Sequence, residues 1–184
     1  MACSNITKMA FDLCEGSVGG IRTVYLADWK RAVAKIGDDG KNVESFAPAT
    51  GETIEWHEYK FRKNTSSLTS TLNVQDDGSS MIGTDLVMQF SRMDTDKRLA
   101  INAMTYADVM AVVVDSNGTA FFLGNTNPLY VSAGEGVTGQ NRTDSNHYSL
   151  TLHDDDADYP YTLTQTALDA VIANAKANDK ELGA

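Results

Sequence analysis

The sequence predicts an α+β fold that is mainly β: a β-sandwich or barrel with one packed helix, a long protruding β-hairpin and a C-terminal helix. Three observations support this prediction. Apolar and polar residues alternate with the period of two that a strand imposes, most clearly between residues 67 and 90. Helical spacing of three and four residues occurs near residues 95–107 and again after residue 164. Asp-Gly and Asn-Gly pairs separate short β-rich runs, as they do in hairpins.

The longest predicted element is a two-stranded ribbon over about residues 60–92, with Asp77-Gly78 at its turn. The apolar residues expected to form its packing face are Leu68, Leu72, Val74, Leu86, Met88 and Phe90. The polar residues expected on the opposite face are Ser67, Thr69, Thr71, Asn73, Asp85 and Gln89. Two strands alone cannot bury enough apolar surface in water, so we expect the apolar face to pack against the body of the domain.

The segment before the ribbon predicts strands and turns. Residues 1–20 are expected to form an N-terminal arm, and the β-rich run 21–27 follows, with Trp29 covering one edge of the core. Asp39-Gly40 lies between two short extended runs and predicts a hairpin, and residues 49–51 mark another turn. We expect extended chain from there to the ribbon.

After the ribbon the spacing becomes helical. Asp94 or Thr95 can cap a helix whose predicted apolar stripe is Leu99, Ala100, Ala103, Met104 and Ala107. Asn117-Gly118 gives the strongest hairpin signal, and the run 110–114 predicts a strand buried on both faces. The remaining expected elements are a short strand at 128–132, a polar loop at 134–146, a last strand at 148–153, an acidic loop, and a helix from about Thr164 with Leu168, Val171, Ile172 and Ala175 on one stripe.

Length and charge limit the organisation and the partners of the chain. Its 184 residues predict one β domain at 21–163, between the arm and a C-terminal helix and tail at 164–184. With 25 acidic and 15 basic residues the formal charge is −10, which argues against a surface that grips nucleic acid. There is no apolar run of about 20 residues and no export signal, so we expect a soluble protein made in a cytoplasm, without a membrane partner.

The sequence gives no convincing sign of catalytic, cofactor or metal chemistry, and we therefore expect a protein that is not an enzyme. Residues 134–139 match the G-x-G-x-x-G string, but they lead into a polar stretch and a strand and do not open a helix. The acidic run 153–158 lacks the alternating ligands of a calcium loop and predicts a solvated turn. Cys3 and Cys14 are too few for a zinc site or a disulfide framework, and we expect free thiols. The histidines are scattered: His57, His147 and His153.

Basic residues concentrate at the base of the ribbon: Lys60, Arg62 and Lys63 before it, and Arg92, Lys97 and Arg98 after it. One interpretation is that these are solvated strand ends. The other is that they meet acidic groups of a neighbouring copy, such as Asp76, Asp77 or the 154–158 segment. Such contacts between copies would orient head-to-tail assembly more than strengthen it.

Four stretches together resemble the tail-tube proteins of long-tailed bacteriophages: EYKFRKNTSSLTSTLN, DLVMQFSRMDTDKRLAINAM, VMAVVVDSNGTAFFLG and NHYSLTLHDDD. The resemblance spans roughly residues 20–160 and concerns the order of the predicted elements and the local sequence of these four stretches. It implies a β-sandwich or barrel carrying a helix, and a long hairpin from each subunit that joins its neighbours to make the inner face of a ring, often of six subunits. The resemblance further implies that rings stack into a tube through which DNA passes, with related folds in the inner tubes of contractile injection machines and type VI secretion systems.

The resemblance implies a structural virion protein located in the phage tail, made in the bacterial host cytoplasm and acting through self-association. The polar ribbon residues 67, 69, 71, 73, 85 and 89 would then face the lumen, where few cations mean little adhesion to DNA. Two alternatives remain open. One is another virion ring, such as a head-to-tail joining or tail-terminator protein. The other is a monomeric β-sandwich that binds a glycan or peptide through Trp29, Trp56 or Tyr130.

Overall fold

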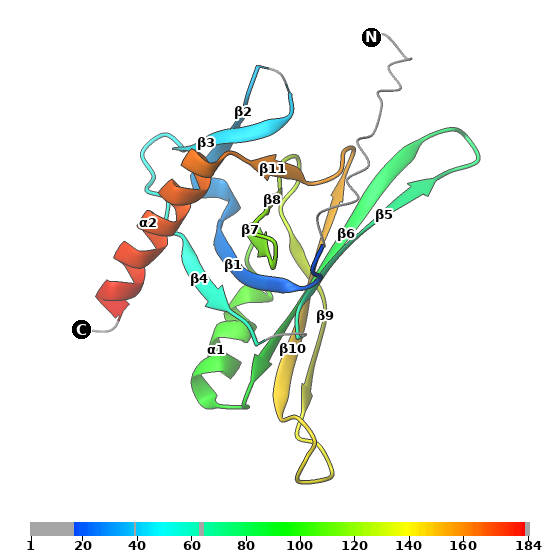
Figure 1. Cartoon of the computed structure of the whole chain (residues 1–184), viewed down its shortest axis with the longest axis vertical. Coiled ribbons are helices and arrows are strands. Elements are labelled where there is room, and N and C mark those ends of the chain that lie inside the picture. Colours follow the sequence, from blue (N-terminus) through cyan, green and yellow to red (C-terminus); the bar gives the residue numbers. More distant parts are fainter. Residues whose placement is uncertain (1–16, 39, 63–64, 183–184) are drawn as a thin grey trace.

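The computed structural model describes residues 17–38, 40–62 and 65–182, with the backbone alone for 179–182. Their strands form two sheets, and the fold is mainly β, as predicted (Figure 1). The seven-stranded sheet has the order β2-β3-β11-β8-β7-β1-β4, with β1 Ile21–Asp28, β2 Ala32–Ile36, β3 Asn42–Pro48, β4 His57–Lys60, β7 Val109–Asp115, β8 Ala120–Leu123 and β11 Tyr161–Leu163. The four-stranded sheet has the order β5-β6-β10-β9, with β5 Ser67–Val74, β6 Ser80–Ser91, β9 Tyr130–Val137 and β10 His147–Asp156.

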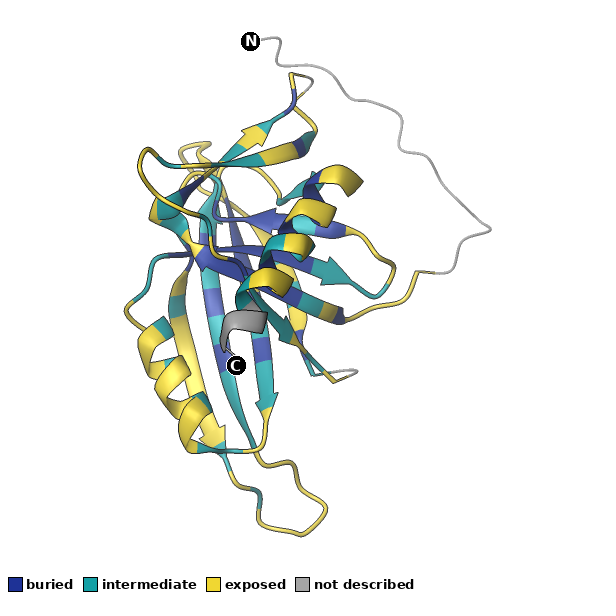
Figure 2. Cartoon of the chain, turned by 90° about the vertical axis from the view of Figure 1, so that its left-hand side faces the viewer, coloured by how far each residue is buried: buried dark blue, intermediate teal, exposed yellow. Residues whose placement is uncertain are grey.

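The fold has three layers, because both faces of the seven-stranded sheet are covered. Helix α2 (Gln165–Leu182) lies on one face, where its buried residues are Ala167, Leu168, Val171 and Ala175 (Figure 2). The four-stranded sheet covers the other face. Strand β7 lies between β1 and β8, so its central residues are buried on both sides, as the apolar run predicts. The described strands pack as two sheets and do not close into a barrel.

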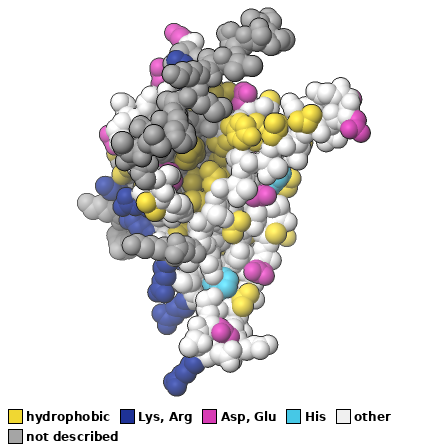
Figure 3. Space-filling model, turned by 45° about the vertical axis from the view of Figure 1, so that its right-hand side comes forward, with side chains coloured by type: hydrophobic (Ala, Val, Ile, Leu, Met, Phe, Trp, Pro, Cys, Tyr) yellow, Lys and Arg dark blue, Asp and Glu magenta, His cyan; other side chains and the backbone are white. Residues whose placement is uncertain are grey.

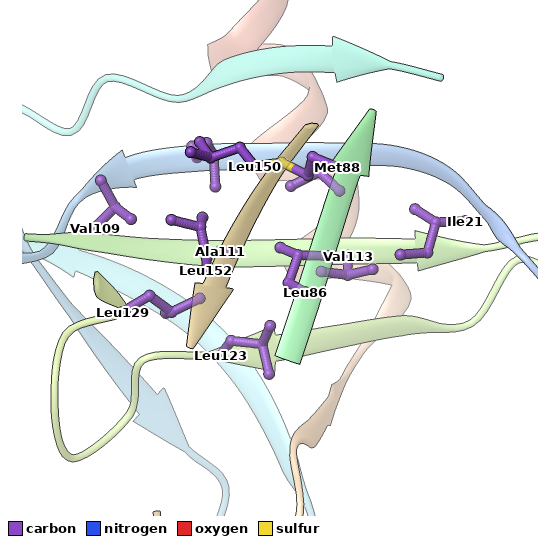
Figure 4. Packing of buried hydrophobic residues seen from close by; sticks show 12 residues of the cluster. Ile21, Leu86, Met88, Val109, Ala111, Val113, Leu123, Leu129, Leu150 and Leu152 are labelled. Carbon is purple, nitrogen blue, oxygen red and sulfur yellow. The ribbon is translucent and has the colours of Figure 1, made fainter. Parts of the chain in front are cut away.

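The core between the two sheets holds the four-stranded sheet in place (Figure 4). Leu86 and Met88 of β6 and Leu150 and Leu152 of β10 point toward β7 and are almost completely buried. The strands of the two sheets cross at a steep angle in this view, so the four-stranded sheet extends beyond the body at both ends (Figures 1 and 4). At one end it extends as the β5–β6 hairpin, and at the other as the loop after β9.

The two predicted hairpins outside the ribbon are confirmed. Between β7 and β8, Gly118 adopts a φ of 93°, and the Asp115 carboxylate accepts hydrogen bonds from the backbone of Asn117 and Thr119 at 2.9 and 2.8 Å. Between β2 and β3, Gly40 adopts a φ of 68°. Both turns need the left-handed conformation that glycine adopts without strain.

Helix α1 (Thr95–Met104) is capped by Asp94, which accepts a hydrogen bond from the Lys97 backbone at 2.9 Å. The apolar stripe predicted for this helix is wrong in part. Leu99, Ala100 and Ala103 are exposed, and the side chains that pack against the core are Ile101, Met104 and the following Ala107. The helix has no buried residue and packs on the body through only a few side chains. Other apolar side chains of the helix, such as Leu99, therefore remain exposed.

Three expected boundaries need correction. The hairpin is β5–β6 and begins at Ser67, because residues 57–60 instead pair with β1 in the other sheet. The expected polar loop starts later, because residues 134–137 pair with β10 as part of β9. The acidic loop starts later as well, because the aspartates at 154–156 belong to β10 and hold the β8–β9 connection. They accept hydrogen bonds from Gly124 N, Asn127 Nδ2 and Thr126 Oγ1 at 2.9, 3.1 and 2.9 Å.

Candidate assembly surface

The four-stranded sheet has an inner face toward the core and an outer face that no described element covers. The strand registers assign these residues to the outer face: Ser67, Thr69, Thr71 and Asn73 of β5; Met81, Gly83, Asp85, Val87, Gln89 and Ser91 of β6; His147, Ser149, Thr151, His153 and Asp155 of β10; Tyr130, Ala133, Glu135 and Val137 of β9. No Lys or Arg occurs among them. Figure 3 looks toward this side, and its surface is mostly uncharged, with scattered carboxylates and histidine.

All six polar ribbon residues lie together on this outer face. Thr69 pairs with Asp85 across β5 and β6, and Gln89 pairs with Ser149 of β10. The four β5 residues and Asp85 are exposed, and Gln89 is half-buried. The sequence pattern therefore placed these six side chains on one surface correctly.

The outer face also carries a charged cluster that sequence reasoning missed. The two ring nitrogens of His153 lie 2.7 Å from Asp85 Oδ1 and 3.0 Å from Asp155 Oδ1, and Tyr130 packs edge-on against the ring at 5.5 Å. The hydrogen bond to Asp85, followed by that to Asp155, raises the pKa of the His153 imidazole. A neutral imidazole can donate from one nitrogen only, so the doubly protonated form fits both carboxylates. When protonated, His153 places one positive charge between two carboxylates on this face.

Both edges of the four-stranded sheet lack a partner strand in the described part of the chain. The edges are β5 and β9, each with eight residues, and they run in opposite directions. Soluble proteins usually protect edge strands with charges, proline or bulges. Strand β5 contains no charged residue, no proline and no break in its register with β6, whereas β9 carries one bulge and a single charge, Glu135.

The inner face of the hairpin changes character along its length. Leu86 and Met88 are buried as predicted, and Leu68 and Phe90 pack against the same core. The prediction is wrong for Leu72 and Val74, which are 49% and 66% exposed. They are correctly placed on the apolar side of β5, but they lie on the edge strand: Ile82 of β6, the register partner of Leu72, is buried, whereas Leu72 and Val74 are not. We refer to Leu72 and Val74 as the exposed apolar pair.

A polar pair on the inner face lies between Leu68 and Leu86 on one side and Leu72 and Ile82 on the other. Ser70 and Thr84 share a hydrogen bond of 2.8 Å on the inner face, opposite Asp154 of β10. Asp154 is almost fully buried. Its Oδ2 accepts the Gly124 hydrogen bond, whereas Oδ1 has no partner among the described residues. Burial raises the pKa of the Asp154 carboxyl.

The charges considered for contacts between copies lie at opposite ends of the molecule. Asp76 and Asp77 occupy the hairpin tip, where Asp77 Oδ1 accepts hydrogen bonds from Ser79 N and Oγ at 2.9 and 2.7 Å. The basic residues Arg92 and Arg98 are exposed at the end of β6 and on α1, at the other end of the hairpin. Figure 3 shows Lys and Arg gathered toward this lower part and carboxylates at the tip.

The remaining predicted charges lie near the start of the hairpin. Lys60 forms an ion pair with Glu58 of its own chain at 2.7 Å, Arg62 is exposed, and Lys63 lies outside the described residues. Cys3, Cys14 and the N-terminal arm as far as residue 16 lie outside them as well.

The aromatic residues considered for ligand binding do not form one site. Trp56 is buried against Phe46 with a ring distance of 5.1 Å, and the indole of Trp29 donates to the Gly124 carbonyl at 2.8 Å. Tyr130 is half exposed, on the other sheet. Within the described residues, no group of three or more His, Cys, Asp or Glu is arranged to hold a metal ion, and no helix is both long and apolar enough to cross a membrane.

Comparisons with known proteins add no family to this description. No protein-family model matches the chain, and no curated protein matches it at a significant level.

Proposed function

We propose that this protein is the repeating subunit of a phage-type tail tube, located in the virion tail, in which copies join side by side into rings that enclose a DNA-conducting channel. The observation that carries the proposal is the four-stranded sheet, with two unpaired edges and a polar outer face without Lys or Arg. The resemblance to tail-tube proteins gives the same expectation independently of the packing.

The directions of the two edges favour a ring. Because the sheet has four antiparallel strands, β5 of one copy can pair with β9 of the next in an antiparallel ladder, and the same contact can repeat around an axis. Each copy would contribute four strands, so four or more copies would give at least about 16 strands, enough to leave an aqueous channel in a closed barrel. Six copies, the number implied by the resemblance, satisfy this condition.

The stagger of the sheet also favours closure. Through the registers, Val74 lies level with Ser80 of β6, whereas Tyr130 lies level with Asp85. The edges are thus offset by about five residues, or roughly 16 Å, over a repeat of four strands about 4.8 Å apart. If β5 and β9 pair along their full lengths, the strands tilt by roughly 40°, within the range of about 35–45° found in closed barrels.

The chemistry of the outer face suits a channel for DNA better than a DNA-binding surface. Phosphate binding depends on Lys and Arg, which this face lacks, and its hydroxyls, amides and carboxylates favour hydration. The acidic hairpin tip and the exposed Arg92 and Arg98 at the opposite end further suit stacking of rings in one orientation. Contacts between Asp76 or Asp77 of one ring and Arg92 or Arg98 of the next would act mainly on orientation.

Negative-stain microscopy of the purified full chain tests the proposal. We expect hollow rings that stack into tubes as the protein concentration rises. Single rings that never stack would support a terminator or head-to-tail joining protein. Monodisperse monomers at high concentration would refute self-assembly altogether and favour a binding module.

A second experiment tests the assignment of the outer face to the channel. Thr71→Lys combined with Gln89→Lys should leave assembly intact but make the tubes retain DNA, with retention falling as salt rises. The matched control is Thr50→Lys with Thr53→Lys, which adds the same charge on the exposed β3–β4 connection of the other sheet. Equal DNA retention by both variants would contradict the assignment.

A further inference from the structure

The inner face of the four-stranded sheet has a hollow beside β9. Its volume is about 380 Å3, and it lies between Ile101 of α1 and the following Thr105 on one side and the strands β9 and β10 on the other. The hollow exists because the inner-face residues of β9 that pair with Tyr148 and Leu150 are Gly136 and Gly134. It is therefore a gap in the apolar layer at the open edge of the sheet.

The two glycines differ in how much space they leave. A Cβ at Gly136 would lie 3.0 Å from Met93 Cε and 3.0 Å from the Tyr148 ring, so this end of the hollow is closed. A Cβ at Gly134 would make only ordinary contacts, the nearest being 3.5 Å from Leu150 Cδ1. The open part of the hollow is therefore at Gly134, next to the unpaired edge.

Leu72 lies on the face of β5 that matches the hollow. In the full-length antiparallel pairing of β5 with β9, Leu72 of one copy lies opposite Ser132 of the next, which lines the hollow beside Gly134 and Val131. The hollow of about 380 Å3 has room for about a dozen groups the size of a water molecule, more than the side-chain carbons of one leucine. The edges also oppose no like charges, because β5 is uncharged and β9 carries only Glu135.

We propose that Leu72 of one copy enters the hollow of the next copy between Gly134 and Val131, against Ile101 of its α1 helix. This inference rests on the proposed side-by-side assembly and names its specific contact. It accounts for Gly134 of β9, for the exposure of Leu72, and for the sparse packing of α1 within one chain. The occupant is a second copy of this chain.

The decisive variant is Gly134→Val, which places a side chain in the open part of the hollow, at a position whose Cβ makes only ordinary contacts and whose φ is not left-handed. We expect the protein concentration needed for ring formation, measured by sedimentation velocity and microscopy, to rise at least about tenfold. The matched control, Ala133→Val, adds the same side chain on the outer face and should assemble like the wild type. Adding Leu72→Ala to Gly134→Val makes room again and should restore assembly.

The outcomes separate this inference from the proposed function. If the wild type forms rings and Gly134→Val assembles equally well, the inference is overturned and the proposed function stands. If the wild type itself stays monomeric, both are overturned. If Gly134→Val fails to fold by circular dichroism, Leu72→Asp decides: it should lose assembly while its outer-face neighbour control, Thr71→Asp, assembles, and equal behaviour of these two overturns the inference.

Discussion

The inner face of the hairpin offers a test in which the same Leu→Ala substitution should lower stability strongly at one position and weakly at another. Leu72 and Leu86 lie on the same side of the β5–β6 hairpin and belong to one apolar stripe in the sequence. Leu86 is completely buried in the core between the sheets, whereas Leu72 is 49% exposed beyond it. Leu86→Ala and Leu72→Ala therefore remove the same atoms from two different environments.

The expected magnitudes follow from this difference. Leu86→Ala loses the burial of the side chain and leaves a cavity among Leu150, Leu152 and Val113, so it should lower the free energy of unfolding by about 3–5 kcal/mol. Leu72→Ala loses about half as much burial and leaves no enclosed cavity, so about 1 kcal/mol is expected. For a chain of this size these losses lower the melting temperature by roughly 6–20 °C and 2–4 °C.

The assay is thermal and urea unfolding at a protein concentration where sedimentation shows monomers, because assembly would stabilise the folded chain by mass action. At concentrations that allow rings, the effect of Leu72→Ala should grow, while that of Leu86→Ala should change little. A loss for Leu72→Ala in the monomer as large as that for Leu86→Ala would refute the reasoning, since Leu72 would then be covered within its own chain.

Three further predictions concern single side chains. Hydrogen bonding to Asp85 raises the pKa of His153. The stability that this interaction contributes is therefore present below pH 6.5 and is lost as the pH rises through the raised pKa of the folded state. Unfolding followed against pH should show this loss in the wild type and not in His153→Gln. Gly124→Ala should lower the free energy of unfolding, measured in urea, by at least about 3 kcal/mol, because φ is 89° and the new methyl would lie 2.9 Å from a side-chain carbon of Leu129. The control Gly118→Ala has a similar φ of 93° but open space around the new methyl, so it should cost only about 1–2 kcal/mol. Burial raises the pKa of Asp154, so Asp154→Asn should raise stability relative to the wild type at pH 8, with the gain disappearing as the pH falls toward 3.8; a gain that is constant with pH would exclude a charge effect.

The alternation of residues in the sequence was sufficient to assign faces but not to assign what covers them. It placed Leu72 and Val74 on the same side as Leu86, which is correct, and packed them against the body, which is wrong. The reason is physical: a period of two reports the side of a strand on which a residue lies, while burial depends on which elements cover that position. Ile82 on the inner strand β6 is buried, whereas its register partner Leu72 on the edge strand β5 is exposed, and no local pattern encodes this difference.

Local propensity misled the prediction where tertiary contacts dominate. Gly134 and Gly136 have low strand propensity, yet pairing with β10 makes them part of β9, which hid both the second edge of the sheet and its hollow. The aspartates at 154–156 resemble a solvated loop in sequence, but their oxygen atoms accept hydrogen bonds from the β8–β9 connection and hold it in place. By contrast, turns that need a left-handed residue, such as the one at Gly118, were predicted correctly because their signal is local.

The open features of the single chain support one another, because all of them lie on the same four-stranded sheet. An unpaired edge alone is satisfied by water, and an exposed leucine alone is ordinary on a protein surface. Here β5 presents both an uncharged edge and the exposed apolar pair, while β9 presents the second edge and a hollow on the matching face. A two-fold contact through β5 alone would leave β9 and its hollow open, whereas pairing β5 with β9 satisfies both edges and repeats with each added copy. The proposed closed ring would satisfy every one of these features, and it would turn the polar outer faces of all copies toward either a shared interior or the outside, a choice that the DNA-retention experiment decides.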